Sequence, residues 1–138
     1  MYEFTGYFAR PAVSRPVVLP PGAVWREIAV PFSGVGVRLP DSGDERGLPA
    51  PADVQALARK LGLDAADYWV YLDYVCWGGE IDFVYGLNSH RGVLFGPVKE
   101  DAHKAVEAAY SSLMEQFGVP AELALNFAPF RRGYWGED

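Results

Sequence analysis

The sequence predicts a single α+β domain over residues 1–138, in which an antiparallel sheet of about five to seven strands carries two helices. Half of the 138 residues are hydrophobic, which excludes a disordered chain and suffices for one packed core. Aromatic residues make up 14% of the chain, and large rings suit the pleated, half-buried surface of a sheet. The pair Gly78-Gly79 separates two aromatic, β-branched runs, which indicates a central hairpin.

The front of the chain is rich in turns, because eight of the eleven prolines lie within the first 51 residues. Loose alternation of apolar and polar residues predicts a first strand, and clustered prolines predict an irregular connection after it. In order, we expect a strand over 2–9, a connection over 11–22, a hairpin of 23–31 with 35–39, and a mobile, polar loop over 40–49.

Two helices are predicted from apolar residues that recur every three to four positions. The shorter helix covers 51–61 and stops at Gly62, and the longer covers 99–117 and stops at Gly118. We expect the longer helix, in the C-terminal half of the chain, to pack on the sheet. The remaining expected elements are a third short strand over 93–95, a last strand over 122–127, and a tail over 129–138 whose rings dock on the core while Arg131 and Arg132 stay solvated.

The central hairpin splits into two faces if Gly78-Gly79 is a two-residue turn, because side chains alternate along a strand. The predicted pairs are Trp77 with Glu80, Cys76 with Ile81, Val75 with Asp82, Tyr74 with Phe83, and Asp73 with Val84. The set expected to face the core is Val70, Leu72, Tyr74, Cys76, Ile81, Phe83, Tyr85 and Leu87. The opposite set is Trp69, Tyr71, Asp73, Val75, Trp77, Glu80, Asp82 and Val84.

This second face combines carboxylates with large rings, which suggests a binding surface. Between Leu61 and His90 the sequence has five acidic residues and no Lys or Arg, so a negative field extends over about 8 Å at physiological salt. Tyr and Trp are enriched at binding hot spots. The predicted partner-binding residues are Trp69, Tyr71, Asp73, Trp77, Glu80 and Asp82. The alternative is an ordinary hairpin, with one apolar and one polar face, whose rings are covered by a helix.

The sequence favours binding over catalysis, and we expect no catalytic residue, metal or cofactor. Cys76 falls on the predicted core face, where a free cysteine behaves as a small hydrophobe. His90 and His103 are the only histidines and do not have the spacing of paired metal ligands. The acids of the hairpin lack the alternating loop pattern of a cation site.

The charge balance indicates which partners to expect. The chain has 18 acidic against 12 basic residues, a net charge of -6, which argues against nucleic acid because phosphate binding needs clustered Lys and Arg. No apolar run approaches the ~20 residues that span a membrane. The first residues do not resemble a signal peptide. We therefore expect a soluble, cytoplasmic protein with a positively charged protein partner, no nucleic acid and no membrane.

The function predicted first is that of a small acidic protein-binding module, one version being an immunity- or antitoxin-type inhibitor that covers the basic site of a toxin. Two alternatives remain open. The same carboxylates and rings suit a small carboxylate-based hydrolase or sugar-binding protein. The chain can also be a structural homodimer.

Overall fold

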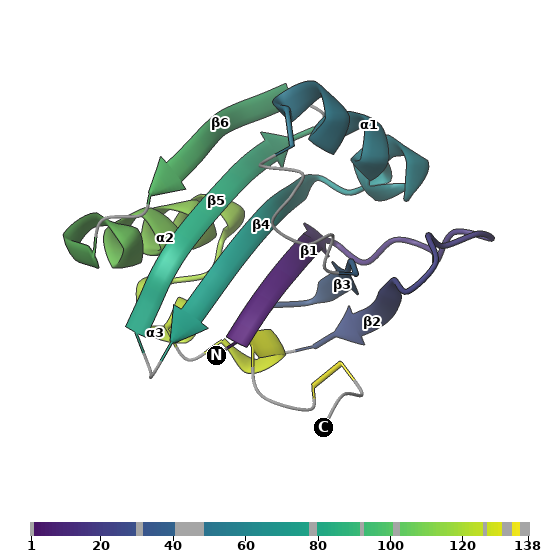
Figure 1. The fold of residues 1–138 in the computed structure, drawn as a ribbon. Coiled ribbons are helices and arrows are strands. Elements are labelled where there is room, and N and C mark those ends of the chain that lie inside the picture. The colour runs from purple at the N-terminus through teal and green to yellow at the C-terminus, as the bar shows by residue number, and fades with distance from the viewer. Residues whose placement is uncertain are drawn as a thin grey trace.

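The computed structural model describes residues 2–29, 32–40, 49–77, 80–91, 93–100, 103–125, 127–130 and 134–135. Its centre is a six-stranded antiparallel sheet with the strand order β2-β3-β1-β4-β5-β6 (Figure 1). Two main helices pack on this sheet, one of them in the C-terminal half. The predicted single α+β domain is therefore confirmed.

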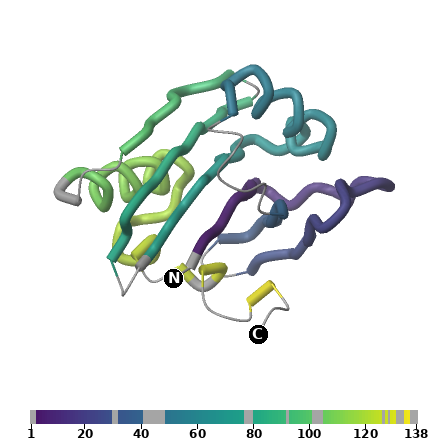
Figure 2. The backbone as a smooth tube through the Cα atoms, viewed as in Figure 1, coloured from purple at the N-terminus to yellow at the C-terminus, as the bar shows by residue number. Residues whose placement is uncertain are grey.

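Most of the predicted elements are present, with shifted ends. The strands are β1 (Tyr2–Arg10), β2 (Val24–Ile28), β3 (Gly34–Arg38), β4 (Tyr68–Trp77), β5 (Glu80–His90) and β6 (Val93–Glu100). The helices are α1 (Pro51–Lys60), α2 (His103–Phe117) and α3 (Ala121–Ala124), with short 3-10 turns at Leu63–Ala65 and Ala128–Phe130. The segment between β1 and β2 has no strand and projects away from the sheet, as the purple tube of Figure 2 shows.

Each face of the sheet has its own hydrophobic core. On the α2 face, which lies behind β4 and β5 in Figure 1, α2 and the C-terminal segment cover the sheet. On the α1 face, α1 and the following turn cover the upper part of β1, β4 and β5. The α2-face core includes Phe4, Phe8, Val70, Leu72, Val84, Val106, Tyr110, Leu113 and Phe117. The α1-face core includes Tyr7, Val35, Val37, Val54, Ala58, Leu61, Trp69, Tyr71 and Leu87.

A bulge in the central hairpin overturns half of the predicted register. Trp77 pairs with Glu80 and Cys76 with Ile81 as predicted, but Val75 then pairs with Phe83, so Asp82 is an extra residue. One inserted residue exchanges the faces of everything beyond it. Phe83, Tyr85 and Leu87 therefore lie with the α1-face core, and Val84 lies on the α2 face.

Two further elements differ from the prediction. The expected last strand over 122–127 is wrong, because residues 121–124 form α3, whose N-cap Pro120 precedes the good helix formers Ala-Glu-Leu-Ala. The long helix begins at His103 rather than at Lys99, because β6 continues to Glu100 and pairs with β5 as far as Val84. Most of the predicted mobile loop, residues 41–48, lies outside the described residues.

The close approach of α2 to the sheet depends on Gly86 in β5. A Cβ at this position would lie 2.5 Å from Cδ1 of Leu113 in α2 and 3.3 Å from Cδ2 of Leu72 in β4. Any larger side chain would require Leu113 to shift. Glycine weakens a strand, so its presence in the middle of β5 is explained by this contact.

We expect Gly86→Ala to destabilise the fold by about 1–3 kcal/mol, because the added methyl overpacks the interface between α2 and the sheet. Leu113→Ala should destabilise it as well, through a cavity. The double variant should cost at least about 1 kcal/mol less than the sum of the two, because the cavity accepts the methyl. Urea unfolding of the four proteins measures this coupling, and strict additivity would contradict the contact.

Candidate functional site

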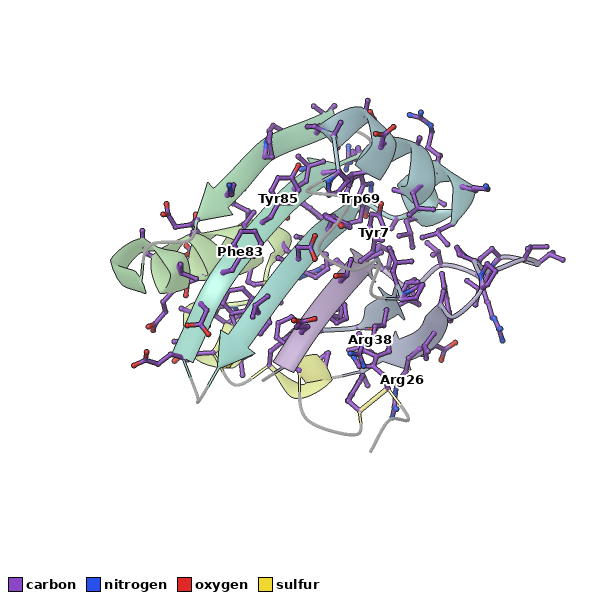
Figure 3. All side chains as sticks on the ribbon, viewed as in Figure 1. Tyr7, Arg26, Arg38, Trp69, Phe83 and Tyr85 are labelled. Atoms are coloured by element: carbon purple, nitrogen blue, oxygen red, sulfur yellow. The ribbon has the colours of Figure 1, made fainter. Side chains whose placement is uncertain are left out.

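The α1 face of the sheet is covered unequally along the strands. Near α1, Tyr7 and Trp69 are buried, whereas Thr5 and Asp73 farther along the same strands, and Phe83 on β5, are half-buried. Figure 3 shows Trp69 and Tyr7 close to α1, with Phe83 farther along β5. We call this partly open region the hairpin end. Its residues are Glu3, Thr5, Asp73, Val75, Glu80, Asp82 and Phe83.

Two of the predicted binding rings belong to the core. Trp69 is 1% exposed and Tyr71 is 4% exposed, so neither lies on an exposed face as the sequence predicted. Both rings pack edge-on against Tyr7, with centroids 5.6 and 5.1 Å from it, beneath α1. For these two residues the alternative prediction, a helix that covers the rings, is the one observed. The side chain of Trp77 lies outside the described part of the chain.

Asp73 accepts hydrogen bonds from two neighbouring side chains. The Thr5 hydroxyl donates to its Oδ1 at 2.6 Å, and the Tyr71 hydroxyl lies 3.3 Å from its Oδ2. Thr5 is its direct cross-strand neighbour on β1, and Tyr85 is its neighbour on β5. The carboxylate is therefore oriented by two adjacent strands at the boundary between the core and the open region.

Three tyrosines around this carboxylate act as neutral hydrogen-bond donors. Tyr7 donates to the carbonyl of Val54 at 2.7 Å, and Tyr85 donates to the carbonyl of Pro49 at 2.8 Å. Both bonds tie the sheet to α1 or to the residues just before it. Burial raises the pKa of Tyr7, Tyr71 and Tyr85, and the charge of Asp73 raises it further in the last two.

The other acids extend the negative region toward the turn. Glu80 is exposed, Asp82 is half-buried at the bulge, and Glu3 lies opposite Val75. Basic side chains come from two other strands of the described part: Nη2 of Arg38 in β3 donates to the main-chain carbonyl of Glu3 at 3.1 Å, and Lys99 in β6 is the cross-strand partner of Tyr85. Of the three acids predicted from the sequence, Glu80 and Asp82 lie at the end of the hairpin where β5 begins, and Asp73 lies midway along β4, opposite Tyr85.

This arrangement is better suited to attracting a cation than to proton transfer. A general acid near neutral pH needs a pKa close to 7, whereas burial moves the tyrosine pKa values here in the opposite direction. Within the described residues, no three His, Cys, Asp or Glu side chains are grouped as a metal site.

The cysteine and the two histidines of the chain lie at positions that the fold explains. Cys76 is half-buried against the α2-face core, as predicted. His90 is exposed, and its ring packs against Tyr68 with centroids 4.4 Å apart. His103 begins α2, and its side chain lies outside the described part.

Sequence reasoning missed Glu3 and Thr5, which β1 contributes to the hairpin end. Their alternation with Tyr7 shows that the three share a face, but the pairing of β1 with β4 joins residues far apart in the chain. It also missed Asn88, which is buried and donates to the carbonyl of Leu113 at 3.1 Å, joining β5 to α2.

Comparison with protein-family models, with curated proteins and with solved structures found no match to this chain. Among the described residues, no helix combines the length and apolar character needed to cross a membrane.

The tyrosine pKa shifts predict how stability changes in alkali. The ordinary tyrosine pKa is about 10, so above pH 10 the unfolded chain loses phenolic protons that the folded chain retains. The contribution of these tyrosines to the free energy of unfolding is therefore fully present below about pH 10 and is lost as the pH rises above it.

We expect Tyr71→Phe to cost about 0.5–1.5 kcal/mol at pH 7 through the lost hydrogen bond. Above pH 10 the free energy of unfolding of the variant should fall less steeply than that of the wild type. The difference in slope should be about 1.4 kcal/mol per pH unit, because the variant lacks one titrating group. Denaturant unfolding between pH 7 and about pH 11.5 measures both effects. Parallel curves for the two proteins would contradict the buried, neutral phenol.

Proposed function

We propose that this protein is a small acidic binding module that docks its hairpin end on a positively charged protein. The observation that carries the proposal is that Asp73, Glu80 and Asp82 are distributed along the half of the hairpin that also holds the half-buried Val75 and Phe83. The rings predicted to bind, Trp69 and Tyr71, have a supporting role here, because they pack beneath α1 and hold the face in shape.

The two kinds of side chain have different roles in binding. Acidic side chains accelerate the encounter with a cationic surface, and salt weakens this effect because the field decays over about 8 Å. Once the surfaces meet, Val75 and Phe83 supply apolar area whose burial slows dissociation. A surface with both properties binds quickly and releases slowly.

A specific version of this function is an immunity- or antitoxin-type inhibitor that covers the basic active site of a toxin in the cytoplasm. Its support is the net charge of -6 and the acidic side chains of the hairpin end. An inhibitor of this kind needs one complementary surface and no substrate cleft.

The two alternatives receive less support. A carboxylate-based hydrolase requires a protonated carboxyl group as the acid, whereas Asp73 accepts hydrogen bonds from Thr5 and Tyr71. A homodimer that continues the sheet must pair two edge strands. Charged Arg26 and Glu27 on β2, and Pro97 on β6, discourage such pairing.

We expect Glu80→Gln combined with Asp82→Asn to weaken binding of a polyarginine peptide by about three- to tenfold, because exposed ion pairs contribute about 0.2–1 kcal/mol each. Asp73 is left unchanged, since its hydrogen bonds to Thr5 and Tyr71 make its loss a stability effect as well. Titration calorimetry between about 0.05 and 0.5 M NaCl measures affinity and its dependence on salt.

The matched control is Glu107→Gln with Glu115→Gln, which removes the same charge from exposed positions of α2. The control should change affinity by less than twofold. Equal effects of the two double variants would show that only net charge matters, and would contradict a docking surface at the hairpin end.

A further inference from the structure

A second surface, separate from the hairpin end, holds the aromatic pair Tyr134-Trp135 near the C-terminus. Trp135 is 5% exposed and packs on the α2 face, where its ring lies 5.7 Å from that of Phe4 and 6.4 Å from that of Phe8. Its indole Nε1 donates to the carbonyl of Pro129 at 2.8 Å. This pair therefore lies against the sheet although it forms no strand of it.

The indole fits a gap that β3 leaves at Gly36. A Cβ on Gly36 would lie 2.7 Å from Cη2 of Trp135, 3.0 Å from Cδ1 of Ile28 and 3.1 Å from Cδ1 of Phe8. Any other residue at this position would occupy the volume of the ring. Gly36, Ile28 and Phe8 thus form the floor and walls of an aromatic slot, which is the name used below.

Arg26 completes the aromatic slot at the edge of the sheet. Its guanidinium lies 4.2 Å from the centroid of the Tyr134 ring, within the range of a cation–π contact, and it also donates to the main-chain carbonyl of Tyr134. Figure 3 places Arg26 near the short yellow segment that holds Tyr134 and Trp135. A single side chain therefore recognises both the ring and the backbone of Tyr134.

The strands that form the aromatic slot, β1, β2 and β3, are paired through their main chains in the sheet, and Tyr134-Trp135 takes no part in that pairing. β2 and β3 are joined to each other and to β1 by antiparallel pairing between Val24 and Arg38 and between Ala9 and Val35. Tyr134 and Trp135 add side chains and one main-chain carbonyl to these strands, and Trp135 belongs to the core on the α2 face. Their relation to the slot is that of a short peptide ligand to its site.

We propose that the aromatic slot is a peptide-binding site for an adjacent Tyr-Trp pair, which the chain's own Tyr134-Trp135 fills in the monomer and which the same segment of a second copy can fill instead. The second copy is the occupant because its pair has the shape that Gly36 admits and the ring and carbonyl that Arg26 contacts. The tethered pair competes at a local concentration in the millimolar range, so the monomer dominates when the chain is dilute.

The experiment separates the slot from its ligand in the full-length chain. The acceptor is Tyr134→Ala with Trp135→Ala, whose slot is empty, and the probe is a fluorescent peptide with the sequence of residues 129–138. We expect saturable binding with a Kd of about 0.1–1 mM, at least tenfold tighter than to the wild type, whose own pair blocks the slot. Gly36→Ala in the acceptor should abolish binding, and Arg26→Ala should weaken it about three- to tenfold.

Two results would overturn the site: a folded acceptor that does not bind the peptide, or binding that Gly36→Ala leaves unchanged. If the acceptor does not fold, the exposed substitution Arg26→Ala in the otherwise unchanged chain tests the same contact. Hydrogen exchange at the Trp135 indole should then become at least threefold faster while the amides of β4 and β5 keep their rates. Unchanged exchange at the indole would count against the site.

The source of the pair is tested by replacing the peptide with a second copy. A chain with Gly36→Ala keeps its pair but has a blocked slot, so mixing it with the acceptor should produce a heterodimer at millimolar concentration in sedimentation equilibrium. Neither chain should dimerise alone. Peptide binding without a heterodimer would support the slot and exclude the second copy as its occupant.

Discussion

The bulge at Asp82 determines which side chains of the central hairpin are buried and which remain near solvent. Because one residue is inserted in β5, Val84 reaches the core beneath α2, while Phe83 and Tyr85 turn toward the side of α1. Without it, Phe83 and Tyr85 would be directed at α2, and the hairpin end would lose its half-buried ring. The bulge therefore divides the central hairpin into a half that joins the core and a half that carries acidic side chains.

The same division explains how a small domain has two cores and a charged end. α1 covers the sheet where Tyr7, Trp69 and Tyr71 pack together, and Tyr7 and Tyr85 bind carbonyls of that segment. Asp73 lies where this cover ends, and Thr5 and Tyr71 orient it. The negative charge is consequently held on a rigid part of the sheet, which favours recognition because little order must be gained on binding.

Residue patterns within single elements predict most of this fold. The features that they do not predict depend on how separate strands pair with one another. The hairpin turn, the stop of α1 at Gly62 and the apolar stripe of α2 each follow from neighbours in the chain. The bulge has no local signature, so Phe83, Tyr85, Leu87 and Val84 were assigned to the wrong faces. Asp73, Glu80 and Asp82 were found because acids without basic neighbours are visible in the sequence. Glu3 and Thr5 were not, because they join the hairpin end through the β1–β4 pairing.

The most direct test of the account is the register of the hairpin in solution, read from cross-strand Hα–Hα and amide NOEs in an isotopically labelled sample. The bulge predicts contacts of Val75 with Phe83, Tyr74 with Val84 and Asp73 with Tyr85. Contacts of Val75 with Asp82, Tyr74 with Phe83 and Asp73 with Val84 would instead show a regular hairpin. That result would place Phe83 beneath α2 and contradict the acidic and apolar surface from which the binding function is inferred.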